Sequence, residues 1–177
     1  VDADGKFDYE DLDAKVRVAM RFMDNVVDAN YYFWKENEIK AKEIRRTGIG
    51  SMGLGDALIK MKLAYGSDEA QPVIEKIYKT IRDASYDTSS DLAKEKGSFP
   101  MFDDVKYLQG HFIQSLPTDI KTKIKTQGIR NAVILTQAPT GTTSLLAGVS
   151  SGIEPVFDFK FTRKDRTKSN SIHVSTQ

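Results

Sequence analysis

The chain has 177 residues, of which 40% are hydrophobic and 29% charged, a composition typical of a globular protein and not of a disordered or membrane-spanning one. Its 26 basic and 25 acidic residues leave a formal net charge of +1, which argues against a nucleic-acid polymer or a membrane as partner. The absence of cysteine excludes disulfides, thiolate metal sites and a cysteine nucleophile. The first residues have neither the basic start nor the apolar run of a signal peptide, so we expect a cytoplasmic protein.

The first predicted element is a helix, because apolar residues recur at steps of three and four from Leu12 to Val27. Asp8 is a suitable N-cap, and Asp11 falls in the first turn. Four aromatic residues follow, and we interpret them as rings that fill a core: Tyr31, Tyr32, Phe33 and Trp34.

Two more helices are predicted, one from Leu54 to Met61 and a long one from about Asp68 to Lys96, which Gly97 ends. Residues 97–120 contain many helix breakers and indicate turns and short helices. Residues 131–137, NAVILTQ, are predicted to form a buried strand that leads through a tight loop to a helix start near Thr143. Beyond Gly152 we expect extended chain to about residue 162 and then a polar tail. Since no linker is evident, we treat residues 1–177 as a single domain.

Several motifs have simple structural explanations. Gly48, Gly50 and Gly53 spell GxGxxG, but no apolar strand precedes them, so we expect close packing and not a dinucleotide site. The opening VDADGKFDYED imitates part of a calcium loop, yet a turn before a capped helix explains the same aspartates: Asp2, Asp4, Asp8 and Asp11.

Two further groups of residues are poor site candidates. His111 and His173 lack nearby ligand partners, which argues against a metal site. A cluster of cations near the C-terminus is interpreted as a solvated face: Lys160, Arg163, Lys164, Arg166 and Lys168.

The most informative segment is APTGTTS, residues 138–144. Gly141 is expected to adopt a backbone conformation closed to residues with a Cβ, and four hydroxyls surround it, those of Thr140, Thr142, Thr143 and Ser144. With the amides of a helix start, these groups would form a cradle for an anion, and the loop has no Lys or Arg. Two interpretations remain open from chemistry alone: a phosphate site, or a helix start capped by one hydroxyl.

Two segments resemble the large catalytic subunit of ribonucleotide reductase. They are RRTGIGSMGLGDALIKM, residues 45–61, and RNAVILTQAPTGTTSLLAGVSSGIEPVF, residues 130–157. The pair APTGTTS and SSGIEP is typical of the adenosylcobalamin-dependent (class II) type. KGSFPMFDDVKYLQG and SLPTDIKTKIKTQGIRNA also fit, so the likeness covers nearly the whole chain. Gln137 is a small departure, because an apolar residue often precedes the Ala-Pro.

The resemblance implies an α/β fold in which this mostly helical chain is a C-terminal section of a ten-stranded barrel with a central finger loop. It implies that the loop binding the substrate phosphate comprises Pro139, Thr140, Gly141, Thr142, Thr143 and Ser144. The family reduces ribonucleotides by a radical mechanism that uses cysteines, with an Asn and a Glu on the finger loop. Since those cysteines are absent, we expect this section alone to be inactive and to carry no catalytic residue.

The implied partners are a ribonucleotide, the remainder of the reductase chain, adenosylcobalamin and a thioredoxin-type reductant. A section cut from a barrel would also expose edges through which it could self-associate. The alternatives are a non-catalytic helical interaction module and a nucleotide-sensing module, each derived from the same scaffold.

Overall fold

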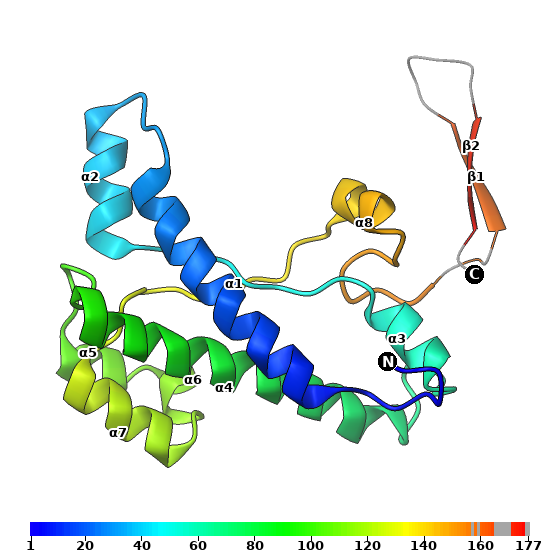
Figure 1. Cartoon of the computed structure of the whole chain (residues 1–177), viewed down its shortest axis with the longest axis horizontal. Coiled ribbons are helices and arrows are strands. Elements are labelled where there is room, and N and C mark those ends of the chain that lie inside the picture. Colours follow the sequence, from blue (N-terminus) through cyan, green and yellow to red (C-terminus); the bar gives the residue numbers. More distant parts are fainter. Residues whose placement is uncertain (157, 159, 165–170, 176–177) are drawn as a thin grey trace. The chain divides into compact units, whose positions relative to one another are not determined.

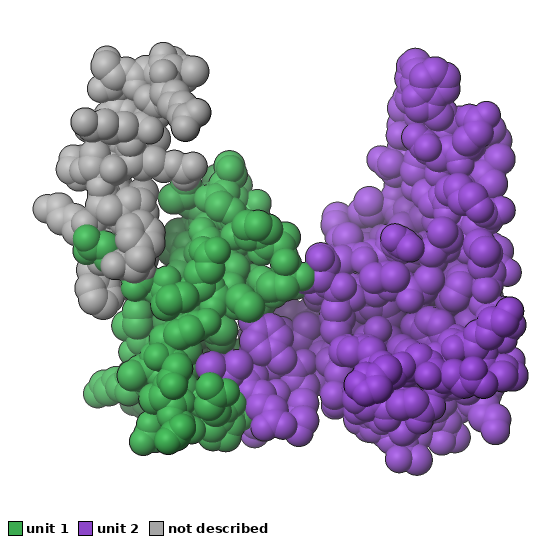
Figure 2. Space-filling view, turned by 180° about the vertical axis from the view of Figure 1, so that it is seen from behind, with its two compact units in different colours: residues 1–7, 50–73, 137–177 green, residues 8–49, 74–136 purple. Residues whose placement is uncertain are grey.

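The computed structural model describes residues 1–156, 158, 160–164 and 171–175, and this part of the chain is mostly helical (Figure 1). It forms two compact units (Figure 2). The unit of residues 8–49 and 74–136 is called the helical unit here, and that of residues 1–7, 50–73 and 137–177 the loop unit. None of the helices in the described residues is both long and apolar enough to cross a membrane.

The helical unit begins with α1, Tyr9–Ala29, which confirms the first predicted helix. Asp8 caps it, and its carboxylate accepts a hydrogen bond from the Asp11 amide at 2.9 Å. The remaining helices are α2 (Lys35–Ile44), α4 (Ala70–Lys96, in this unit from residue 74), α5 (Asp104–Leu108), α6 (His111–Gln114) and α7 (Thr118–Gln127). The long helix, its end at Gly97 (φ 86°) and the short helices after it agree with the predictions.

The core of the helical unit joins α1 and α4 to the short helices. Its buried members are Met20, Tyr86, Leu92, Phe99, Ile113, Leu116, Ile120, Ile124, Ile129 and Ile134. Seven of these ten are Leu or Ile, and they come from α4, α6, α7 and the segments after them, so burial of apolar side chains from several elements holds the unit together.

The predicted aromatic core at the end of α1 is wrong for three of its four rings. Tyr31, Phe33 and Trp34 are 83%, 75% and 60% exposed. They lie in the turn between α1 and α2, where Phe33 and Trp34 pack edge to face on each other with centroids 4.9 Å apart. Tyr32 is half-buried, and its hydroxyl donates to the Val27 carbonyl at 2.9 Å. The rings follow the last helical turn, so helical periodicity does not direct them to the core.

The predicted strand at residues 131–137 is shorter than expected. It pairs with residues 47–49 through the bonds Thr47 N to Val133 O (2.9 Å), Ile49 N to Ile134 O (2.8 Å) and Thr136 N to Ile49 O (3.0 Å). These bonds make one parallel bridge, between Ile49 and Leu135. Ile134 is fully buried, whereas Val133 is 42% exposed, so the segment has one buried face. The continuous apolar run had suggested burial on both faces.

The loop unit contains α3 (Leu54–Lys60), α8 (Gly141–Ala147), β1 (Lys160–Lys164) and β2 (Ser171–Ser175). The two strands pair antiparallel, with Lys160 opposite Ser175 and Lys164 opposite Ser171. Helix α3 agrees with the prediction, and α8 begins two residues before the expected start at Thr143. The expected irregular tail is wrong at residues 171–175, where β-branched Ile172 and Val174 alternate with other residues as in a strand.

Gly128, the C-cap of α7, offers a test of the packing in the helical unit. It has φ 82°, and a Cβ built on it would overlap the Ser98 hydroxyl. Gly128→Ala is therefore expected to lower the free energy of unfolding by about 1–3 kcal/mol, measured by urea denaturation. Gly97→Ala is the matched control, because Gly97 has φ 86° but nothing within 4 Å of such a Cβ. Equal losses in the two variants would show that the Ser98 contact contributes nothing.

Candidate functional site

The PTGTTS loop, residues 139–144, belongs to the loop unit and leads into α8. Its left-handed residue is Thr140, with φ 55°, and not Gly141. Gly141 is the first residue of α8, and a Cβ built on it would meet nothing within 4 Å. The prediction that Gly141 adopts the special conformation is therefore wrong. The turn comes one residue earlier because the Thr140 hydroxyl accepts a hydrogen bond from the Gly152 amide at 2.8 Å, which holds Thr140 in place.

The hydroxyls of the loop divide into two pairs. Thr140 and Ser144 face the protein: Ser144 is 1% exposed, and its hydroxyl lies 2.9 Å from that of Ser151. Thr142 and Thr143 are exposed, as are Pro139 and Gly141. The structure thus brings the six predicted residues together. Four of them are exposed to solvent, and the side chains of Thr140 and Ser144 are not.

The first turn of α8 keeps unpaired amides. The Ser144 amide bonds to the Thr140 carbonyl at 2.8 Å, whereas the three preceding amides, those of Gly141, Thr142 and Thr143, have no acceptor within an α-helix. The N-cap Thr140 makes no side-chain capping bond, since its hydroxyl is bound to Gly152. This contradicts the interpretation of a helix start capped by that hydroxyl. No charged residue occurs between residues 137 and 153, so the loop itself offers only neutral donors to a ligand.

The segment after α8 connects the loop to α3. The Ser150 carbonyl accepts from the Gly53 amide at 2.8 Å, and the Ser150 amide donates to the Asp56 carboxylate at 2.5 Å. A Cβ on Gly55 would lie 3.1 Å from the Glu154 carbonyl oxygen, and one on Gly53 would lie 3.2 Å from Val149. These glycines allow close contact between the two segments, which confirms packing as the role of this part of the glycine-rich motif.

Gly48 has the same role in the helical unit, because a Cβ on it would lie 2.6 Å from Thr136 Cγ2. The aspartates of the apparent calcium loop also have the predicted structural roles. Asp2 accepts from the amides of Asp4 (3.1 Å) and Lys6 (2.7 Å), with Gly5 at φ 79°, and Asp8 caps α1.

The remaining sequence candidates are the two histidines and the C-terminal cations. His111 is exposed at the start of α6, and the side chain of His173 lies outside the described residues. The same holds for the side chains of the C-terminal cation cluster, of which Arg166 and Lys168 are outside the described residues altogether.

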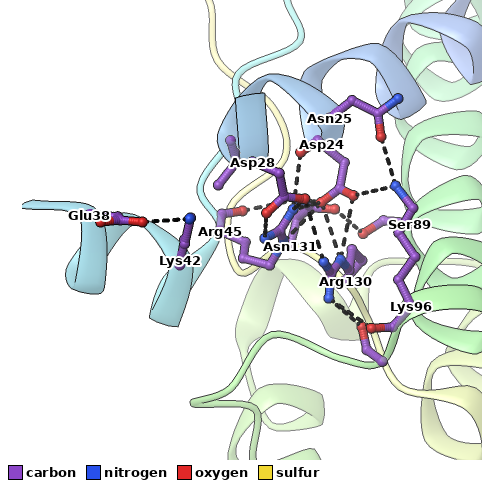
Figure 3. Close-up of polar contacts among 12 residues, drawn as sticks. Asp24, Asn25, Asp28, Glu38, Lys42, Arg45, Ser89, Lys96, Arg130 and Asn131 are labelled. Atoms are coloured by element: carbon purple, nitrogen blue, oxygen red, sulfur yellow. Dashed lines mark hydrogen bonds and ion pairs between the residues drawn. The ribbon is translucent and has the colours of Figure 1, made fainter. Parts of the chain in front are cut away.

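A buried ionic cluster in the helical unit was not predicted from the sequence (Figure 3). Asp24 of α1 is 0% exposed, and its Oδ1 accepts from Arg45 Nη2 at 2.7 Å and from Asn131 Nδ2 at 3.1 Å. Its Oδ2 accepts from Lys96 Nζ at 3.2 Å, and Arg130 Nε lies 3.4 Å away. The donors come from the end of α2, from α4 and from the segment of Arg130 and Asn131. One carboxylate of α1 therefore ties together α4 and the two segments that lead into the parallel bridge.

Arg45 is the second centre of this cluster. Its guanidinium is 4% exposed and donates two bonds of 2.8 Å to the carboxylate of Asp28, besides those to Asp24 (Figure 3). Its backbone is left-handed, with φ 50°, where α2 ends. The side chain can therefore turn back toward α1 while the chain continues as the segment that pairs with residues 133–136.

The charges of the cluster shift its protonation equilibria. Burial raises the pKa of Asp24, but hydrogen bonds from Arg45 and Asn131 and the charges of Arg45 and Arg130 outweigh it, and the pKa is lowered. Hydrogen bonding by Arg45 is the main cause of the lowered pKa of Asp28. Both carboxylates are therefore ionised at neutral pH. The partners of Asp24 are 21 to 107 residues away in sequence, so no local pattern could have indicated the cluster.

Comparison with known proteins places the whole chain in one sequence family. The family model described as "Ribonucleotide reductase, barrel domain" matches residues 1–177. A vitamin B12-dependent ribonucleoside-diphosphate reductase of Mycobacterium tuberculosis is 37% identical over 161 residues, which cover 91% of this chain and 21% of that protein.

Two other similar proteins come from distant organisms. A vitamin B12-dependent ribonucleoside-diphosphate reductase of Thermoplasma acidophilum is 38% identical over 158 residues, covering 89% of this chain and 19% of that protein. The ribonucleoside-diphosphate reductase large subunit of vaccinia virus is 33% identical over 172 residues, covering 91% of this chain and 22% of that protein. The chain thus spans about a fifth of the length of the curated relatives it matches.

The buried cluster predicts a large effect for a small substitution. Asp24→Asn removes the buried negative charge that faces Arg45 and Arg130, so we expect the free energy of unfolding at pH 7 to fall by about 3–5 kcal/mol. Urea denaturation measures this loss. Glu75→Gln is the control, since Glu75 and Lys79 form an exposed pair on α4, and no measurable change is expected there.

The same variant predicts a change in pH dependence. The folded-state pKa of Asp24 lies below its ordinary value of 3.8, so its contribution is complete above that value and is lost as the pH falls through the folded-state pKa. The parent chain should therefore lose more stability than Asp24→Asn on acidification below about pH 4. Parallel stability curves for the two proteins would contradict the assignment.

Proposed function

Because the chain belongs to the ribonucleotide reductase family, we propose that it is a section of the catalytic barrel of a complete cytoplasmic reductase that converts ribonucleotides to deoxyribonucleotides. The proposed contribution of this section is the PTGTTS loop, which binds the substrate phosphate. The observation that carries this assignment is the uncapped first turn of α8, whose amides lie beside the exposed hydroxyls of Thr142 and Thr143.

The chemistry of the loop suits the charged end of a nucleotide. Amides of Gly141, Thr142 and Thr143 would donate to phosphate oxygens, and the two exposed hydroxyls would add further donors. Neutral donors neutralise less charge than lysine or arginine, so their main effect is to orient the phosphate. The loop would thereby position the ribose at a fixed distance from the reacting groups.

The proposed fold of the complete domain is the ten-stranded α/β barrel, with residues 1–177 as one part of a single domain. The parallel bridge between Ile49 and Leu135 supports this, because parallel pairing of two segments joined through helices is typical of α/β folds. A further consequence is that strand edges of this section would pair with the remainder of the chain, or with another copy when the section is alone.

The redox chemistry belongs to other parts of the complete protein. The chain contains no cysteine, so neither a thiyl radical nor a reducing dithiol can form on it. We propose that the remainder of the chain supplies these groups and that a thioredoxin-type reductant restores them.

Adenosylcobalamin is the proposed cofactor, since the relatives of Mycobacterium tuberculosis and Thermoplasma acidophilum are named vitamin B12-dependent. It would supply the radical. The donors of the PTGTTS loop suit a small anion and not a corrin ring, so no step of the cofactor's chemistry is assigned to this section.

A nucleotide-sensing or interaction module built on the same scaffold is the second candidate function. The exposed rings of Tyr31, Phe33 and Trp34 favour an interaction surface. Calorimetry of the separate chain with a ribonucleoside diphosphate distinguishes the candidates. Saturable micromolar binding supports the sensor, and no binding supports a reductase section or an interaction module.

Gly141→Val tests the loop in the complete reductase. Because φ of Gly141 is not left-handed and nothing lies within 4 Å of its Cβ position, the substitution should leave stability unchanged. The new side chain would obstruct access to the first-turn amides, so nucleotide binding should weaken by about 1–3 kcal/mol in calorimetry. Unchanged affinity in a folded variant would remove the phosphate-binding assignment.

A second experiment tests the proposed division of labour. The 177-residue chain supplied with adenosylcobalamin, a dithiol reductant and a ribonucleoside diphosphate should form no deoxyribonucleotide, because it has no thiol from which to generate the substrate-oxidising radical. Chromatographic detection of deoxyribonucleotide measures the product. Steady turnover by this chain alone would overturn the proposal.

A further inference from the structure

The PTGTTS loop is held by its neighbours at two points and exposed between them. The Thr140 hydroxyl is bound to the Gly152 amide at 2.8 Å, and the Ser144 hydroxyl lies 2.9 Å from that of Ser151. Residues 141–143, between these points, are exposed. The chain enters this segment through residues 137–139, which precede the first of the two contacts.

The entry is held by the side chain of Gln137, through both main-chain polar groups of Ser51. Gln137 Nε2 donates to the Ser51 carbonyl at 2.7 Å, and Oε1 lies 3.4 Å from the Ser51 amide nitrogen and from the Ser51 hydroxyl. Nε2 also lies 3.5 Å from the Ala138 carbonyl. A carboxamide that meets an N–H and a C=O of one residue imitates the pairing between two strands. Ser51 and Gln137 each follow the bridged residues, Ile49 and Leu135, by two positions.

Gly152 lies against the same stretch of chain. A Cβ on Gly152 would be 3.3 Å from the Ala138 carbonyl oxygen, 3.5 Å from that of Pro139 and 3.6 Å from Gln137 Nε2. Gly152 is itself left-handed, with φ 47°, and its amide holds Thr140. The loop entry thus lies against Ser51 and Gly152, and the Gln137 side chain contributes directed bonds to Ser51 there.

We propose that Gln137 is a positioning residue for phosphate binding: its carboxamide, paired with the main chain of Ser51, sets the entry of the loop and with it the direction of the Gly141, Thr142 and Thr143 amides. The inference rests on the proposed function of the loop. It assigns a role to a side chain outside the PTGTTS motif, at a position where the resemblance predicts an apolar residue. An apolar side chain at position 137 could not make these directed bonds.

The test uses the complete reductase and two ligands, a ribonucleoside diphosphate and the corresponding ribonucleoside. Gln137→Leu removes the carboxamide, and Gln137→Glu retains the size but places an oxygen against the Ser51 carbonyl. Both variants should raise the Kd for the diphosphate about tenfold, equivalent to about 1.4 kcal/mol, and leave the Kd for the nucleoside within about twofold. In turnover, KM for the diphosphate should rise while kcat at saturation stays close to that of the parent enzyme.

Gln71→Leu is the matched control. Gln71 is an exposed glutamine in the first turn of α4, and the same chemical change there should leave both Kd values unchanged. Because the Gln137 side chain is exposed, Gln137→Leu is expected to fold, and Gln137→Glu provides a second, isosteric variant.

The outcomes separate this inference from the proposed function. Parent-like diphosphate binding by both Gln137 variants, with weakened binding by Gly141→Val, overturns the positioning role alone. Unchanged binding by Gly141→Val removes the loop assignment and this inference with it. Equal weakening for diphosphate and nucleoside, or loss of folding in both Gln137 variants, assigns Gln137 to general stability and also overturns the positioning role.

Discussion

The carboxylate of Asp24 has no access to water, and a buried charge persists only where partners replace its hydration. Arg45, Lys96, Arg130 and Asn131 supply those partners from elements that are distant in sequence. Apolar packing would tolerate small shifts between helices, whereas these bonds require definite distances and directions. The ionic cluster therefore determines how α1 meets the segments on either side of the parallel bridge in the helical unit.

The loop unit depends on a different kind of constraint, main-chain contact at small residues. Gly53 and Gly55 admit the segment of Ser150, and Gly152 admits the entry of the PTGTTS loop. The left-handed backbone of Thr140, which costs on the order of 1 kcal/mol, is offset by the bond from its hydroxyl to Gly152. Two contacts hold the ends of the loop and leave its middle residues exposed, an arrangement suited to an oriented anion.

Sequence patterns located α1, α3 and α4, because amphipathic periodicity reflects burial of one face over many residues, but they did not predict α2 or the part of α7 beyond residue 120. Sequence patterns were less successful where the conformation of a single turn determines which side chains are buried or which residue is left-handed. Apolar character predicted burial of Phe33 and Trp34, but both follow the last turn of α1 and face solvent. Glycine was expected to take the left-handed position in the loop, yet Thr140 takes it because a long-range hydrogen bond outweighs the local preference.

The sequence by itself determined helices α1, α3 and α4, the absence of thiol chemistry and the family, since these depend on composition, periodicity and contiguous motifs. The tertiary structure alone decided that Asp24 and Arg45 form a buried pair, that the Thr140 hydroxyl leaves the start of α8 uncapped, and that Gln137 meets Ser51. Each of these depends on groups more than ten residues apart. Hydrogen bonds and ion pairs form over about 3 Å, so only folding brings such groups within reach.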